Sequence, residues 1–170
     1  MTPTACAAVA EWINDFVVAH NLCPFAAKEL RAERVRIVET QAADEAALLL
    51  ALHDECTLLM SNPDIETTVL VHPHVLQDFK DYNEFLGLAD ALLGSLDLEG
   101  ELQVASFHPD YCFADTAADA PDNLTNRSPF PMLHLLREES VERAVASHPD
   151  VASIPERNIA LLRSLSEAQR

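Results

Sequence analysis

The chain has 170 residues, a length typical of one compact domain, and 49% of them are hydrophobic, which excludes disorder as a global description. Its formal net charge is −17, from 11 basic and 28 acidic residues, so nucleic acid and anionic membrane surfaces are not expected as partners. No window approaches the roughly 18 apolar residues of a membrane span. The first residues also lack the basic-then-apolar pattern of a secretory signal. We therefore expect a single cytoplasmic domain over residues 1–170.

The N-terminal segment predicts two helices. Thr2 and Pro3 suit the N-cap and the first helical position, and apolar residues recur at helical spacing to about His20. Asn21 is a plausible left-handed terminator. A second, short helix is expected from Pro24 to about residue 32, which would make Cys23 its N-cap.

The middle of the chain predicts helices alternating with strands. Strands are expected at 35–38, 67–71 and 102–107, with helices over 42–60 and 75–93 between them. A helix between successive strands implies parallel neighbours. The sequence thus predicts an α/β fold with a small, mainly parallel three-stranded sheet, flanked by helices and with extra helices at both termini. An α+β arrangement with one antiparallel strand remains open.

Polar residues are concentrated between residues 107 and 138. Residues 114–128 form a long segment without hydrophobic periodicity, and such loops are usually functional or disordered. Ser128 could cap a helix running to about residue 147, with two prolines in its first turn. On that helix His134 and Arg137 would share a partly apolar face, where they either form a structural ion pair or line a cleft. The helix start beside Arg127 would suit an anionic group.

Two strands end in His-Pro, at His72 and at His108. If these strands are parallel, both histidines lie at the carboxyl edge of the sheet, where open α/β sheets place ligands. For His72 we favour a structural role, the binding of a neighbouring carbonyl group, whereas for His108 a structural and a catalytic role are equally plausible.

Cys23 and the loop complete the predicted site. A thiol at a helix N-terminus is stabilised as the thiolate and becomes more nucleophilic, although a buried cysteine at a corner between helices is the simpler interpretation. The other candidates for contact with a substrate are polar side chains in and after the loop: Asp122, Asn123, Asn126, Arg127, Ser128 and Arg137.

Five segments together resemble a known family. They are Asn21-Leu22-Cys23-Pro24-Phe25, Phe107-His108-Pro109 with Tyr111, Asp122-Asn123-Leu124-Thr125-Asn126-Arg127-Ser128-Pro129, His134-Leu135-Leu136-Arg137-Glu138, and Ile154-Pro155-Glu156-Arg157-Asn158. The chain is similar along nearly its whole length to the DUF1415 family of bacterial proteins. The family name states that its function is unknown, so the resemblance assigns no catalytic residues.

Three functions fit these residues. In the first, an enzyme performs group transfer or hydrolysis on a small anionic molecule, with Cys23 as nucleophile and His108 or His134 as general acid/base. In the second, His108 and His134 bind a metal together with a cysteine or Asp122. In the third, the protein is a non-catalytic module that binds a small anion or a peptide. No cofactor is indicated by the sequence, and the few glycines form no phosphate loop.

Overall fold

The computed structural model describes residues 4–165 as a mixed α/β fold. Its helices are α1 (Ala5–Trp12), α2 (Ala26–Arg31), α3 (Glu45–Ser61), α4 (Phe79–Ser95), α5 (Glu138–Ser147) and α6 (Ile154–Ser164). A π-helix, η1 (Ile13–Val18), continues α1, and two 3₁₀ turns are η2 (Pro121–Thr125) and η3 (Val151–Ser153). The strands are β1 (Val35–Glu39), β2 (Thr67–Val71), β3 (Leu102–Phe107) and β4 (Met132–Arg137). Within the described residues, no helix is both long and apolar enough to cross a membrane.

The four strands form one mixed sheet in the order β1-β2-β4-β3. Strands β1 and β2 pair in parallel, whereas β4 pairs antiparallel with both β2 and β3. Strands β1, β2 and β3 therefore run in one direction, as the helices between them predicted. The prediction of a mainly parallel, three-stranded sheet is wrong, because a fourth strand lies antiparallel in the middle.

Strand β4 is the segment that the sequence analysis placed in a helix. The prolines at 129 and 131 lead into this strand, and the residue before a proline is driven toward extended backbone. Met132–Arg137 then pairs along its full length with β2 on one side and β3 on the other. The helix begins only at Glu138, where two glutamates occupy its first turn, and it ends at Ser147 as predicted. His134 and Arg137 consequently lie on opposite faces of a strand and not on one helix face.

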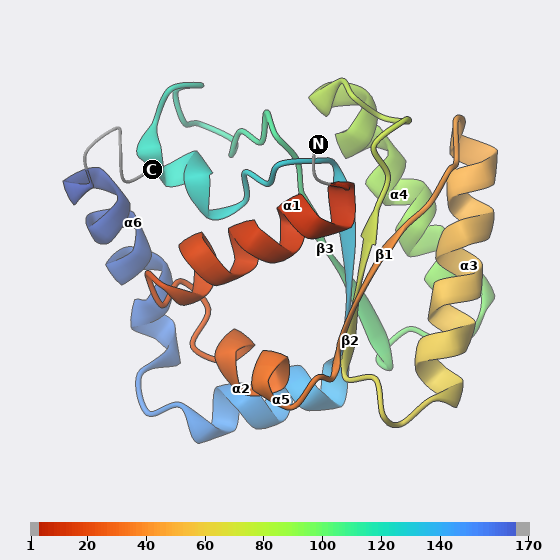
Figure 1. The fold of residues 1–170 in the computed structure, drawn as a ribbon, viewed down its shortest axis with the longest axis horizontal. Helices are drawn as coiled ribbons and strands as arrows, with labels where there is room; N and C mark the ends of the chain where they lie inside the picture. The colour runs from red at the N-terminus through yellow and green to blue at the C-terminus, as the bar shows by residue number, and fades with distance from the viewer. Residues whose placement is uncertain (1–3, 166–170) are drawn as a thin grey trace.

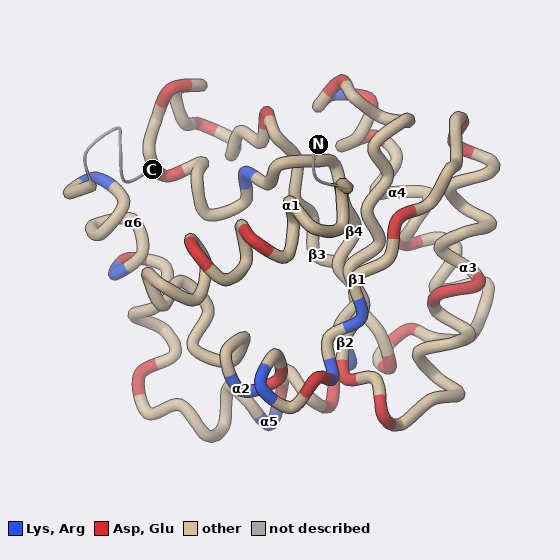
Figure 2. The backbone as a smooth tube through the Cα atoms, viewed as in Figure 1, with Lys and Arg blue, Asp and Glu red and all other residues tan. Residues whose placement is uncertain are grey.

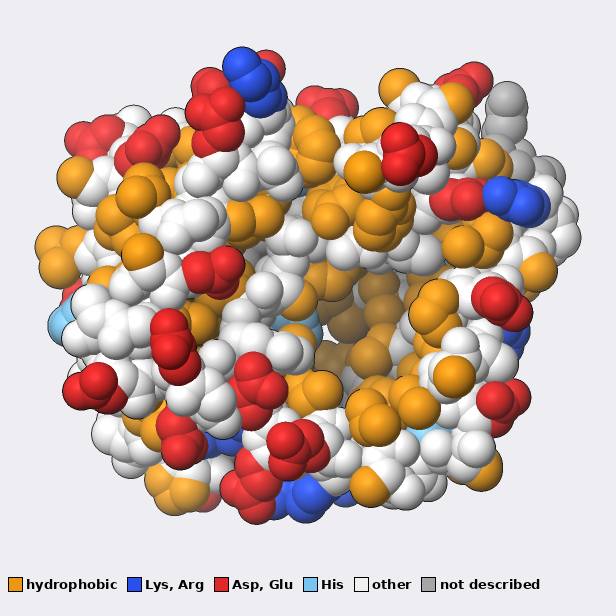
Figure 3. All heavy atoms as spheres, turned by 180° about the vertical axis from the view of Figure 1, so that it is seen from behind, with side chains coloured by type: hydrophobic (Ala, Val, Ile, Leu, Met, Phe, Trp, Pro, Cys, Tyr) orange, Lys and Arg blue, Asp and Glu red, His pale blue; other side chains and the backbone are white. Residues whose placement is uncertain are grey.

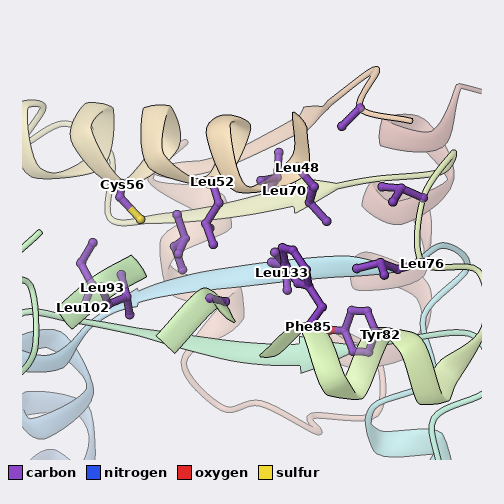
Figure 4. Packing of buried hydrophobic residues seen from close by; sticks show 14 of the residues in the cluster. Leu48, Leu52, Cys56, Leu70, Leu76, Tyr82, Phe85, Leu93, Leu102 and Leu133 are labelled. Atoms are coloured by element: carbon purple, nitrogen blue, oxygen red, sulfur yellow. The ribbon is translucent and has the colours of Figure 1, made fainter. Parts of the chain in front are cut away.

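Helices α3 and α4 cover one face of the sheet (Figure 1). Between these helices and the strands lies the main hydrophobic core, in which Leu48, Cys56, Phe85 and Leu133 are almost completely buried. Figure 4 shows these side chains pointing toward one another from both layers. Every residue of β2 is buried, which agrees with the prediction of a buried strand.

The opposite face carries α1, η1, α2, α5 and α6 (Figure 1). Helix α1 packs against the sheet through Val9, which contributes with Val69 and Met132 to a smaller core. The predicted cap residues Thr2 and Pro3 lie outside the described residues, and the side chain of Thr4 accepts a hydrogen bond from the amide of Ala7 as the N-cap of α1. Farther from α1, the helices on this face leave a cavity between themselves and the sheet.

Candidate functional site

A cavity of about 500 Å³ lies between the sheet and the helices on its less crowded face. Seen from behind, the surface is hollowed at this place and the hollow is lined with hydrophobic side chains (Figure 3). Its apolar walls come from α1, η1, α2, the sheet and α5, and include Trp12, Ile13, Leu30, Phe107, Leu136 and Val141. This volume is typical of pockets that bind small molecules.

A distorted helix and a locked turn form one wall. The π-helix η1 supplies Ile13 and Val17 to the lining, and π-helical segments are rare and frequently occur at functional sites. The chain then turns at Asn21, which adopts a left-handed φ of 51° as predicted. Asn158 of α6 donates a hydrogen bond to the carbonyl of Leu22 over 2.8 Å, so the turn is tied to α6.

His134 presents its imidazole ring to the cavity from the middle of the sheet. The Thr67 hydroxyl lies 2.7 Å from its Nε2 and donates to the carbonyl of Leu135 over 2.5 Å. Because the hydroxyl hydrogen is used in that bond, the Thr67 oxygen accepts from Nε2–H. This assigns the proton of neutral His134 to Nε2 and leaves a lone pair on Nδ1.

Burial also keeps His134 uncharged. Desolvation lowers the pKa of His134 from 6.5 to about 4, since the apolar surroundings disfavour the imidazolium. Within residues 4–165, Nδ1 makes no hydrogen bond to the protein, and it is not among the polar atoms sealed from the surface without a partner. The free acceptor of His134 therefore opens onto the cavity.

Two carboxylates lie at one end of the cavity lining, Glu29 of α2 and Glu66 before β2. Arg34 pairs with both, at 3.5 Å from Glu29 and 2.7 Å from Glu66. Figure 2 shows basic residues gathered around α2, α5 and this end of the sheet. One buried oxygen of Glu29, Oε2, makes no hydrogen bond within the described chain. Lys28 also lies 3.9 Å from Glu29, so the carboxylates of this corner are paired and its arginine is already engaged.

Four of the nine residues predicted for the site line this cavity: Cys23, Asn126, His134 and Arg137. Cys23 therefore shares one cavity with His134, whereas His108 is not part of its lining. Cys23 is not a helix N-cap, however. Helix α2 begins at Ala26, capped by Phe25, and the carbonyl of Cys23 accepts from the amide of Ala26.

His108 lies elsewhere, at the carboxyl edge of β3. Its Nδ1 accepts from the amide of Asp110, so its Nε2–H donates to the carbonyl of Leu76 at 3.1 Å. His72, at the same edge of β2, is bonded to the carbonyl of Val75, as favoured from the sequence. Burial lowers the pKa of His108, and both of its ring nitrogens are occupied, which suits a structural role.

The polar loop mostly stabilises itself. Asn123, fully buried, accepts from the amide of Phe113 and donates to the carbonyl of Ala117, each over 2.9 Å. Asp122 forms a two-point ion pair with Arg163 of α6.

The residues after this loop are also engaged with the protein. Asn126 donates to the carbonyl of Ser106, and Ser128 donates to that of Phe130. Neither Arg127 nor Ser128 caps a helix, because no helix starts there.

The two arginines expected to bind an anion are bound to carbonyl oxygens instead. Arg127 donates to the carbonyls of Tyr111 and Ala118. Although Arg137 contributes to the cavity lining, its guanidinium group is directed to the end of α3, where Nη2 donates to the carbonyl of Leu59 at 2.6 Å and to those of two residues just beyond the helix. The bond to Leu59 satisfies one of the C-terminal carbonyls of α3, which lack partners within the helix.

The metal hypothesis finds no ligand cluster either. Among the residues that the structure describes, no three His, Cys, Asp or Glu side chains come close enough together to hold an ion. Sequence reasoning missed Thr67, Glu29 and Trp12 as site residues, since each was read only as part of a strand or helix.

A family model, described as a protein of unknown function (DUF1415), matches residues 4–170. The chain belongs to the DUF1415 family. The predicted resemblance is thereby confirmed over essentially the whole chain. No curated protein and no solved structure matches this DUF1415 chain. The cavity and its lining are consequently the basis for assigning a function.

Proposed function

We propose that this DUF1415 protein binds a small, mainly apolar molecule in the cavity on the open face of its sheet. The observation that carries the proposal is the 500 Å³ hollow itself, enclosed by hydrophobic side chains from α1, η1, α2, α5 and the four strands of the sheet. Protein interiors are normally packed to the density of organic crystals, so a hollow of this size forfeits contacts that a ligand would restore.

The few polar groups in the lining support this function. Binding pockets typically combine an apolar surface with a small number of polar groups that fix the orientation of the ligand. Here one of these groups is neutral His134, held in one tautomer by Thr67. Such a group adds direction to binding, whereas the apolar walls supply about 25 cal/mol for each Å² that the ligand removes from water.

A neutral fluorescent probe, N-phenylnaphthylamine, tests the proposal. Titration of the full chain should show saturable binding with a rise in probe fluorescence. Ala144 lines the cavity from α5, whereas Ala146 of the same helix is exposed. Ala144→Phe should fill the cavity and abolish the saturable signal, and Ala146→Phe, which adds the same side chain outside it, should leave binding unchanged. Equal binding by a folded Ala144→Phe protein would contradict the proposal.

A second candidate is the enzyme with Cys23 as nucleophile and His134 as general base, and their shared cavity favours it. The Cys23 thiol would pass its proton to His134, and its sulfur would form a bond to the carbonyl carbon of an ester as the bond to the alkoxy oxygen breaks. The departing alcohol takes the proton, and water then hydrolyses the thioester. A pKa of about 4 makes His134 a weak base, so binding ranks first.

Mass spectrometry after incubation with a para-nitrophenyl ester tests the enzyme. The native protein should gain one acyl group, which Cys23→Ser should lack. Cys112 lies outside the cavity lining, so Cys112→Ser should retain the acyl group. An acyl group that remains on the Cys23→Ser protein would exclude the nucleophile.

A further inference from the structure

We propose that the ligand of the cavity is uncharged and donates a hydrogen bond to Nδ1 of His134; this rests on the binding function proposed above. The ligand class is therefore an alcohol, a phenol or a similar neutral donor on an apolar body. The carboxylate or phosphate expected from the sequence is not of this class.

The first support is the direction of the hydrogen bonds around His134. The hydroxyl of Thr67 donates its hydrogen to the carbonyl of Leu135, and its oxygen accepts the Nε2 proton of His134. The lone pair on Nδ1 of His134 is then left without a partner. A group in this state can only accept. An apolar ligand without a donor would cover the lone pair and leave it unsatisfied, which disfavours its binding.

The second support is the charge of the lining. Glu29 and Glu66 both contribute to it, and Glu29 has a buried oxygen without a hydrogen bond. Their partner Arg34 is engaged by both carboxylates. The Nη2 of Arg137 is directed to the carbonyls at the end of α3. Lys28 also lies 3.9 Å from Glu29, so the charges at this corner are paired with one another. An anion would thus lose its hydration and find no free cation among the described residues of the lining to replace it, so exclusion of anions is expected.

The third support is the amide of Asn126, the other polar group of the lining that sequence analysis had assigned to a substrate. Its Nδ2 donates to the carbonyl of Ser106 over 2.9 Å, and its Oδ1 accepts from the hydroxyl of Thr125 over 2.8 Å. The donor expected to hold an anion is therefore used within the protein. His134, by contrast, keeps a hydrogen-bond acceptor, Nδ1, whose state is fixed by the bonds of its neighbours.

Three probes of matched shape separate the alternatives: para-phenylphenol, its methyl ether and para-phenylbenzoate. Calorimetric titration of the full chain at neutral pH should give roughly tenfold tighter binding for the phenol than for the ether, the effect of one hydrogen bond to a buried acceptor. The benzoate should bind most weakly. In His134→Phe, which keeps an aromatic ring but removes the acceptor, the phenol and the ether should bind alike.

Nitrogen NMR of the native protein gives a second readout that needs no variant. The Nδ1 resonance of His134 should move on addition of the phenol and stay in place on addition of the ether. Equal affinity for all three probes, or tightest binding of the benzoate, would overturn the inference while leaving the cavity a binding site. If neither the probes nor N-phenylnaphthylamine bound, the proposed function itself would fail.

Discussion

The two faces of the sheet differ in how they are filled. On one face α3 and α4 pack against the strands, and residues such as Leu52, Phe85 and Leu133 have almost no exposed surface (Figure 4). On the other face the helices stand away from the same strands and enclose a hollow of about 500 Å³ (Figure 3). The first face holds the main hydrophobic core, which stabilises the fold. On the second face, part of the space between helices and sheet is left unfilled.

Strand β4 shows this difference residue by residue. Its alternate side chains Leu133 and Leu135 enter the filled core, whereas His134 and Leu136 line the cavity. The strand is therefore both the centre of the sheet and the floor of the candidate site. Placing a site on a central strand fixes its side chains more firmly than a loop would.

Truncation of leucines on the two faces should show the largest contrast in stability. Leu133→Ala, in the filled core, should lower the free energy of unfolding by about 4 kcal/mol. Leu136→Ala, beside an existing hollow, should lower it by only about 1 kcal/mol, because fewer contacts are lost. Urea denaturation of both variants measures this. Equal losses would mean that the cavity side is packed as tightly as the core.

Acid should destabilise the protein through histidines on both faces. Burial lowers the pKa of His72 from 6.5 to about 4, as it does for His134. The unfolded chain gains these protons first, so the stabilisation is complete above about pH 6.5 and is lost as the pH falls toward 4. For fully buried His72 the loss should be on the order of 3 kcal/mol.

Two variants assign this pH dependence to a face. His72→Asn keeps a donor near the carbonyl of Val75, and His134→Gln keeps one near Thr67, but neither new side chain titrates. For each variant, the urea midpoint is measured at neutral and at mildly acidic pH. The difference between the two midpoints should be smaller in His72→Asn than in His134→Gln, because the ring of His134 opens onto a cavity that water can enter. A smaller difference in His134→Gln than in His72→Asn would mean that His134 is the more strongly desolvated of the two histidines.

The Arg127→Ala variant tests whether this loop arginine contributes to stability or to ligand binding. Removal of the bonds to Tyr111 and Ala118 should cost about 1 kcal/mol of stability, since the groups left behind lie near the surface. Affinity for N-phenylnaphthylamine should not change. A fall in affinity with unchanged stability would instead restore Arg127 to the ligand site.

Filling the hollow should give the smallest change in stability. Ala144→Phe adds apolar contacts without displacing packed atoms, so its free energy of unfolding should stay within about 1 kcal/mol of the native value or rise. Thermal denaturation, compared with the exposed Ala146→Phe, checks this. A marked loss would show that Ala144 is already tightly packed.

Local patterns predicted much of the fold. The β-branched run of β2 and the pattern of β3 gave both strands at their observed bounds, and the intervening helices gave the common direction of β1, β2 and β3. For β4 the same reasoning failed. Met132–Arg137 contains no β-branched residue, and its leucines favour a helix in isolation. Pairing with strands on both sides outweighs that propensity, and no local pattern records it.

The sequence by itself determined the family, the elements other than β4, and four of the residues that line the cavity: Cys23, Asn126, His134 and Arg137. Only the tertiary structure decided which polar groups stay free. Arg127, Arg137 and His108 carry reactive types of side chain, yet each is satisfied by backbone groups elsewhere in the chain. A buried polar group must find a partner, and that partner depends on long-range packing. His134 keeps a free nitrogen because the helices above it leave a space.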